Sequence, residues 1–195
     1  MHGLINRAVQ CFVRDTYGSD LWLRVAREAG LPFDSFEPML RYDVALTDGV
    51  IAAAARILSR PREALLEDLG HYLVSHQNLE SLRRLLRFGG VSFGDFLNSL
   101  EDLPGRGRLA VPDLDLPDLV LQDRGGQIYA LSCRFPMPGV GHVMLGLLRA
   151  MADDYGALVL LDHDGKVAGV EVISIHLADT SHTAGRRFDL AAPVG

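Results

Sequence analysis

The sequence predicts an α+β fold, in which an N-terminal helical lobe precedes a C-terminal lobe that combines an antiparallel sheet with helices. Two observations carry this prediction. Apolar residues recur at helical spacing through the first half of the chain, and after Pro112 short β-type segments flank two turn-forming tetrapeptides. The length of 195 residues suits one domain with a helical lobe over about 1–60, a second lobe over about 61–178 and a tail over 179–195.

Six helices are predicted in the first half from apolar spacing, caps and stops, over residues 4–15, 21–29, 50–58, 61–76, 79–88 and 92–103. Thr47 or Asp48 is expected to cap the third, and Pro61 has the first-turn position that proline favours. Ser92 followed by Asp95 resembles a capping box. Pro104 is expected to end the sixth helix, because proline interrupts the helical hydrogen bonds.

The second half is predicted to hold two β-hairpins and one helix. The first hairpin pairs 119–122 with 127–134, across Asp123-Arg124-Gly125-Gly126. A helix follows over 143–151. The second hairpin pairs 157–161 with 166–176, because Asp164-Gly165 is a strong turn signal. Residues 127–134 and 166–176 are therefore expected in one antiparallel sheet.

Composition excludes several classes of protein. The chain has 19 Lys and Arg against 25 Asp and Glu, a net charge of −6, which argues against binding to nucleic acid. No apolar run approaches the roughly 20 residues of a membrane-spanning helix. The first residues lack the layout of a signal peptide, and two cysteines, Cys11 and Cys133, cannot form a disulfide framework. We therefore expect a cytoplasmic protein that contacts neither nucleic acid nor membrane.

Three groups of residues, taken in order, carry a resemblance to a known family. The chain opens with Met-His-Gly-Leu-Ile-Asn-Arg-Ala-Val and continues with Asp15-Thr16-Tyr17-Gly18. Its middle has Leu69-Gly70-His71-Tyr72 and Phe96-Leu97-Asn98-Ser99-Leu100-Glu101-Asp102-Leu103, and Ser132-Cys133-Arg134 precedes Leu145-Gly146-Leu147. Together they resemble the heme nitric oxide/oxygen binding family (H-NOX, also called HNOB) over nearly the whole chain.

This resemblance implies an H-NOX-like fold with a heme between the two lobes. A His at a helix end would ligate the iron, and a Tyr-x-Ser-x-Arg motif on a strand would hold the heme propionates. The lobe over 61–178 would then be the ligand-binding lobe. The chain would be a sensor domain rather than an enzyme, and it would pass nitric oxide binding on to a histidine kinase or a cyclic-dinucleotide signalling enzyme.

The sequence departs from the family pattern at the iron and at the propionate motif. Pro104 stands at the iron-ligand position, and proline offers no nitrogen lone pair to a metal. Ala130 stands where the motif has Tyr, whereas Ser132 and Arg134 keep the rest, and a hydroxyl with a guanidinium can hold a carboxylate. His142 is the alternative iron ligand, because it begins the helix after Arg134 and could face the pocket from the opposite wall. We predict no ligand at Pro104.

By their position in the family pattern, Ile5, Val9, Leu73 and Pro117 match residues that line the heme cavity. None could donate a hydrogen bond to bound oxygen, which favours nitric oxide or carbon monoxide as the gas. The simpler interpretation of the four is an ordinary core. Two functions stay open: a sensor that binds heme or a related carboxylate-bearing ligand, and a heme-free protein-interaction module that kept the H-NOX fold.

Overall fold

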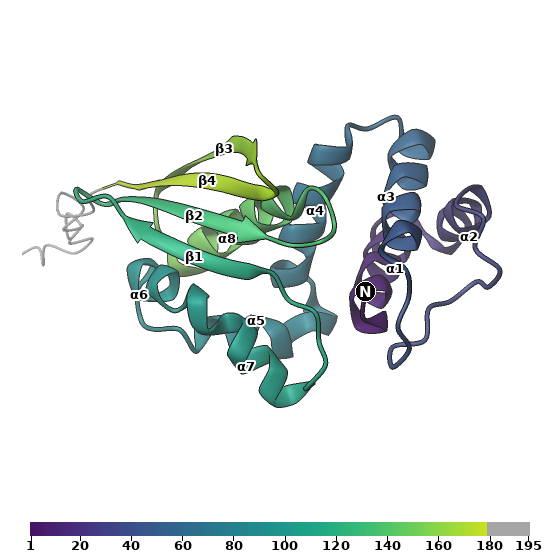
Figure 1. Ribbon diagram of the computed structural model, residues 1–195, viewed down its shortest axis with the longest axis horizontal. Coiled ribbons are helices and arrows are strands. Elements are labelled where there is room, and N and C mark those ends of the chain that lie inside the picture. Colours follow the sequence, from purple (N-terminus) through teal and green to yellow (C-terminus); the bar gives the residue numbers. More distant parts are fainter. Residues whose placement is uncertain (179–195) are drawn as a thin grey trace, which may run out of the picture.

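The computed structural model describes residues 1–178, so the predicted tail over 179–195 lies outside the described residues. Its helical elements precede the sheet except for the last (Figure 1). They are α1 (Gly3–Tyr17), α2 (Ser19–Glu28), α3 (Val44–Leu58), α4 (Arg62–Ser75), η1 (Gln77–Leu79), α5 (Glu80–Arg87), α6 (Phe93–Asn98), η2 (Leu100–Asp102), α7 (Leu103–Ala110) and α8 (Val140–Tyr155). None of these helices has the length and apolarity needed to cross a membrane.

A four-stranded antiparallel sheet forms the other part of the fold, as the sequence predicts. The strands are β1 (Asp118–Asp123), β2 (Ile128–Arg134), β3 (Val159–Val167) and β4 (Val170–Leu177), in the order β1-β2-β4-β3. Helix α8 packs against one face of the sheet, and α4 packs against α8 (Figure 1). The helices α1, α2 and α3 lie beyond α4, so α4 stands between the sheet and the helical lobe.

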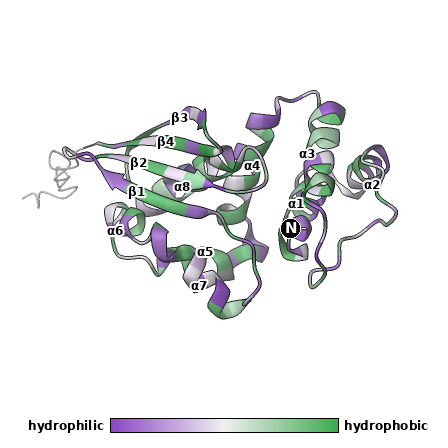
Figure 2. Cartoon of the chain, viewed as in Figure 1, coloured by the Kyte–Doolittle hydropathy of each residue, from purple (hydrophilic) through white to green (hydrophobic). Residues whose placement is uncertain are grey.

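Two apolar cores stabilise the molecule, and α4 contributes to both. The helical lobe buries Phe12, Trp22 and Phe36, together with Leu66 of α4. The second core lies between α8 and the sheet, and Val74 of α4 reaches it. Apolar residues follow α4 and α8, whereas the turn of the β1–β2 hairpin is hydrophilic (Figure 2). The two lobes therefore meet across α4.

Helix α4 approaches α8 closely because two glycines lie at the crossing. A Cβ on Gly70 would collide with the backbone carbonyl oxygen of Val143, and a Cβ on Gly146 would collide with that of Glu67. Each helix thus places a glycine against the backbone of the other, which brings the axes nearer than ordinary side chains allow.

Helix α3 begins earlier than predicted, and α8 extends beyond both ends of the predicted 143–151. Helix α3 begins at Val44, and the Asp43 carboxylate caps it by accepting from the N–H of Ala45 at 2.9 Å. The predicted cap Thr47 is instead buried within the helix, where its hydroxyl donates to Asn6 Oδ1 at 2.5 Å. The capping box at Ser92 and Asp95 is confirmed.

The predicted helix over 92–103 is wrong in its second part. It breaks into α6, η2 and α7, and Pro104 lies in the first turn of α7. Proline is tolerated there because the first N–H groups of a helix have no partner within it. Pro104 therefore begins a helix, which continues to Ala110, instead of ending one.

The first hairpin is confirmed, but the turn of the second was predicted four residues too early. Asp164-Gly165 lies inside β3, where the register between β3 and β4 shifts between His163 and Gly165. The chain reverses at Ala168 and Gly169, which have φ of 49° and 83°. Two positive φ values match a tight hairpin turn, so residues 166–167 belong to β3 and β4 begins at Val170.

Candidate functional site: an apolar cavity between the lobes

A cavity of about 270 Å³ lies between α1 and α8, on the boundary of the two cores. Its walls come from three further helices, α4, α5 and α7, from the segment before β1 and from the segment after β2. The lining residues are Leu4, Ile5, Ala8, Val9, Leu69, Leu73, Leu82, Leu85, Leu86, Leu103, Gly107, Leu114, Leu116, Pro117, Phe135, Met137, Val140, Val143, Met144 and Leu147. No lining side chain carries a nitrogen or oxygen atom, so the walls offer contact to apolar groups only.

The predicted wall residues meet around this cavity. Ile5 and Val9 line it from α1, Leu73 from α4, and Pro117 from the segment that leads into β1. On α8 the lining residues are Val140, Val143, Met144 and Leu147, a spacing that places all four on one helix face. Whether the four predicted residues contact a cofactor stays a prediction.

Ser132 and Arg134 lie on the sheet face opposite to the core. Cys133 between them is fully buried under α8, and its burial raises the pKa of the thiol to about 12. Because side chains alternate along a strand, Ser132 and Arg134 point the other way. Ser132 lines neither the cavity nor the hollow described next, and Ala130, at the motif's Tyr position, is buried.

An open hollow of about 590 Å³ adjoins the cavity, and Arg134 lines it. We call it the arginine hollow, because Arg108 of α7 lines it as well. Its other members are Pro112, Asp113, Leu114, Asp115, Leu116, Asp118, Phe135 and Pro136. Leu114, Leu116 and Phe135 also line the cavity, so these three side chains separate the apolar space from the charged one.

His142 faces away from the cavity. It lies two residues after Val140, on a different face of α8, and its Nδ1 is 3.3 Å from Glu67 Oε1. Its ring stacks on that of His163, with centroids 4.1 Å apart and planes 13° apart. The structure therefore does not bring this predicted alternative ligand to the cavity wall.

A buried carboxylate holds the start of α8. Glu171 of β4 is 3% exposed and accepts from the N–H of Gly139 at 2.8 Å and of Gly141 at 2.9 Å. His163 Nε2 lies 3.2 Å from the same side chain. Burial would raise the pKa of Glu171, but the hydrogen bonds from Gly139, His163 and Gly141 outweigh it and lower the pKa below its ordinary value.

The site matches a heme only in part. Apolar walls suit the faces of a porphyrin, and arginines beside the cavity suit carboxylates. The lining residues include no His that could bind an iron: Pro104 is buried in α7 outside the lining, and among the lining residues only Met137 and Met144 carry a side-chain heteroatom, sulfur. Across residues 1–178 no group of three or more His, Cys, Asp or Glu could hold a metal ion. The residues therefore do not fit a His-ligated heme.

An α+β molecule with two lobes around an apolar cavity is the architecture of the H-NOX sensor domains. The family model described as Haem-NO-binding matches residues 2–163, and the chain belongs to this family. H-NOX domains are sensor domains without catalytic activity of their own, and they act on signalling effectors.

Solved H-NOX structures share the fold. The H-NOX protein from S. oneidensis in the Fe(II)NO ligation state has a TM-score of 0.77 at 17% identity, covering 92% of this chain and 100% of that one. The Fe(II) unliganded H-NOX protein from K. algicida has a TM-score of 0.76 at 16% identity, covering 92% and 97%.

Curated relatives are longer proteins. Soluble guanylate cyclase gcy-31 of Caenorhabditis elegans is 23% identical over 79% of this chain and 22% of its own length. Soluble guanylate cyclase 89Da of Drosophila melanogaster is 20% identical over 92% of this chain and 27% of its own length. The chain thus spans about a quarter of these relatives.

Proposed function

We propose that this chain is an H-NOX sensor domain that binds heme, or a related carboxylate-bearing ligand, in the cavity between its lobes. The observation that carries the proposal is that an apolar cavity adjoins a charged hollow, and that three residues line both. Apolar ligand bodies bind in such cavities, and a few charged groups at the edge fix their orientation. Arg134 would hold the carboxylate, and Ile5, Val9, Leu73 and Pro117 would contact the body of the ligand.

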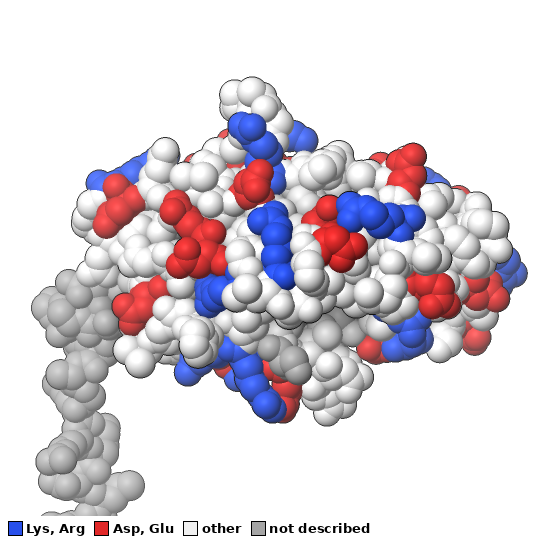
Figure 3. Space-filling model, turned by 60° about the horizontal axis from the view of Figure 1, so that its bottom comes forward, with Lys and Arg blue, Asp and Glu red and all other residues white. Residues whose placement is uncertain are grey.

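Signal output would pass through a partner protein. A histidine kinase or a cyclic-dinucleotide signalling enzyme is the partner that the family resemblance favours, and we propose a cytoplasmic location and no enzyme activity for the domain itself. Nucleic acid is a poor partner for a chain with a net charge of −6. Acidic and basic side chains are interspersed over the face in Figure 3, without a continuous basic surface.

If heme binds, its iron lacks the bond that would pull on a ligand-bearing helix. Signalling would then depend on occupancy of the cavity, through different contacts between ligand and lobes in the two states. The apolar walls carry no hydrogen-bond donor for bound oxygen, which favours nitric oxide over oxygen as the gas.

The second candidate function is a heme-free protein-interaction module. Pro104 at the iron-ligand position and the lack of nitrogen donors in the cavity wall favour it. In that case the cavity would be a remnant, and the surface alone would carry the function.

Titration of the purified chain with heme separates the two. For the sensor we expect saturable binding near one heme per chain, seen as a Soret band that stays with the protein during gel filtration. Leu73→Phe, which narrows the cavity, should reduce this binding. Leu158→Phe, at an exposed position directly before β3, should leave it unchanged. Absence of saturable binding by heme and by every carboxylate-bearing ligand tried would favour the interaction module.

A further inference from the structure

The arginine hollow contains two guanidinium groups that the protein itself does not neutralise. Across residues 1–178 no carboxylate lies within 4.0 Å of Arg108 or Arg134, although arginines elsewhere are paired, among them Arg41, Arg62 and Arg149. Asp118 stands directly opposite Arg134 in the β1–β2 register and still does not pair with it. Two unpaired arginines on one concave surface attract an anion, and a planar guanidinium matches a carboxylate.

The other acids of the hollow are engaged by the helical lobe. Both carboxylate oxygens of Asp115 accept from Arg41 Nη2, at 2.8 and 2.9 Å. Asp113 lies 3.4 Å from the Nε2 atom of the buried His2, and 4.0 Å from Arg41. These contacts engage two of the three acids of the hollow, and among residues 1–178 Arg108, Arg134 and Asp118 keep no oppositely charged partner within 4.0 Å.

The space behind the arginines suits a slender apolar chain better than a broad macrocycle. The cavity volume of about 270 Å³ lies just below the roughly 300–1,000 Å³ of most small-molecule sites. Its walls carry no nitrogen or oxygen side-chain atoms, so a polar group placed there would lose its hydrogen bonds to water without replacement. Leu114, Leu116 and Phe135 line both this space and the hollow, so an alkyl chain that enters from the hollow would pass these apolar side chains.

We propose that the cavity and the arginine hollow together bind a fatty acid. The carboxylate lies between Arg108 and Arg134, and the alkyl chain passes Leu114, Leu116 and Phe135 into the cavity. The ligand needs no iron and no axial donor, which agrees with Pro104 at the family's iron-ligand position. This inference rests on the proposed function, because it takes the cavity as the ligand site, and it names the class of ligand.

Calorimetric titration of the lipid-stripped chain with octanoate, decanoate and dodecanoate, below their micellar concentrations, tests the alkyl part. Burial of each methylene contributes about 0.8 kcal/mol, so affinity should rise about fourfold per methylene until the cavity is filled. Leu73→Phe should weaken dodecanoate binding more than octanoate binding, because it shortens the available space. Circular dichroism confirms that the variant is folded. An affinity that does not depend on chain length would overturn the proposal.

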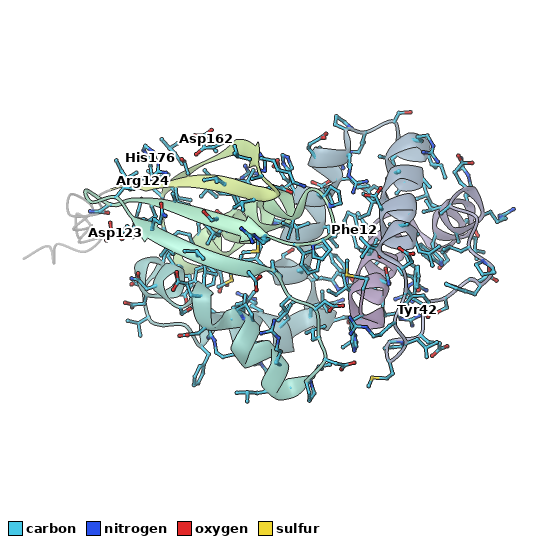
Figure 4. All side chains as sticks on the ribbon, in the orientation of Figure 1. Phe12, Tyr42, Asp123, Arg124, Asp162 and His176 are labelled. Carbon is cyan, nitrogen blue, oxygen red and sulfur yellow. The ribbon has the colours of Figure 1, made fainter. Side chains whose placement is uncertain are left out.

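The charged part is tested with Arg108→Gln, Arg134→Gln and the methyl ester of dodecanoate. Each should weaken binding about tenfold or more, the fold-change that corresponds to loss of a hydrogen bond to a charged group. Arg124→Gln is the matched control, since Arg124 is exposed at the turn of the β1–β2 hairpin, far from the helical lobe (Figure 4). Equal affinities for acid and ester, or an equal loss in the control, would overturn the proposal.

Heme and metal-free protoporphyrin are titrated in parallel. If either binds saturably and the fatty acids do not, the fatty-acid inference fails while the proposed ligand site stands. If neither the porphyrins nor the fatty acids bind, both fail. Fatty-acid binding with the predicted dependence on chain length and arginines supports both.

Discussion

Single residues decide how firmly the elements around the cavity are held together. Glu171 is the clearest case, because a carboxylate that is 3% exposed is stable only with partners for its charge. Two backbone N–H groups and His163 supply them, and they fasten β4 to the first turn of α8. The same turn begins the stripe of α8 residues that lines the cavity. Glu171 therefore positions one wall of the site.

Glu171→Gln should lower the free energy of unfolding by about 1.5–3 kcal/mol at neutral pH, since it removes hydrogen bonds to a buried charge. The pKa of Glu171 is lower in the folded state than its unfolded value of about 4.3. Its stabilisation is therefore complete above that pH and is lost as the pH falls through the folded pKa, so the difference between wild type and variant should shrink in acid.

Urea unfolding at a series of pH values measures this difference. Glu28→Gln is the control, because Glu28 is half exposed and pairs with Arg56 at the surface, where such a change stays within about 0.5 kcal/mol. A difference between wild type and Glu171→Gln that stays constant from neutral to acid pH would mean that the charge of Glu171 is not its source.

Pro104 stands in the first turn of α7, where the family pattern has its iron ligand. Pro104→His keeps α7, because a first-turn position makes no hydrogen bond within the helix, and it returns a nitrogen donor to the family's ligand position. Pro104 itself lies outside the lining, next to Leu103, so the longer His side chain has to reach past the wall; if it does, the heme dissociation constant should fall by about tenfold or more, or ~1.4 kcal/mol. Leu109→His adds the same side chain at an exposed position of α7 and should change nothing. Equal heme retention in both variants would contradict the expectation.

At the scale of the element, local sequence signals predicted the helices better than the turns and breaks between elements. Pro61 and the Ser92–Asp95 capping box were informative because proline and capping side chains act within one turn. The prediction that Pro104 ends a helix was wrong, because a proline that begins a helix and one that ends a helix look alike in sequence. The prediction of a turn at Asp164-Gly165 was wrong because Gly165, with φ of 99°, lies at a β-bulge within β3. The pairing of β3 with β4 continues beyond it, so the chain reverses later.

The packing of α4 against α8 depends on the glycines at their crossing. Gly70→Ala should destabilise the fold by about 1–3 kcal/mol, the range for overpacking, because its Cβ meets the backbone of Val143. Gly49→Ala, in α3, meets nothing within 4 Å and should stabilise by about 0.5–1 kcal/mol. Chemical denaturation of both variants gives the comparison. If both variants change the free energy of unfolding with the same sign, the stability of the fold does not depend on the close approach of α4 and α8.

At the scale of the whole molecule, sequence reasoning located the apolar walls but not the charged hollow. Ile5, Val9, Leu73 and Pro117 come from distant parts of the chain, and only the family pattern brought them together before the fold was known. Arg108, Phe135 and Met144 were missed. The spacing of Val140, Val143, Met144 and Leu147 could have indicated the α8 wall, whereas the meeting of Arg108 with Arg134 depends on how α7 and β2 pack and has no local signal.

At the same scale, the two lobes meet at the cavity, so their relative position should respond to its occupancy. Spin labels at Arg24→Cys on α2 and Gln122→Cys on β1, both exposed sites, report the distance between the lobes. Cys11→Ser removes the half-buried native thiol, and Cys133, with its pKa raised to about 12 by burial, has too little thiolate to react.

Saturation with heme, or in a parallel sample with dodecanoate, should shift the distance distribution by about 2 Å or more, the size of a domain rearrangement on binding. Leu73→Phe narrows the cavity and should reduce the response to added ligand. A wild-type distribution that does not change although calorimetry shows the ligand bound would mean that the lobes do not transmit occupancy. The signal to a partner would then have to arise at the arginine hollow, where Arg41 of the helical lobe contacts Asp115.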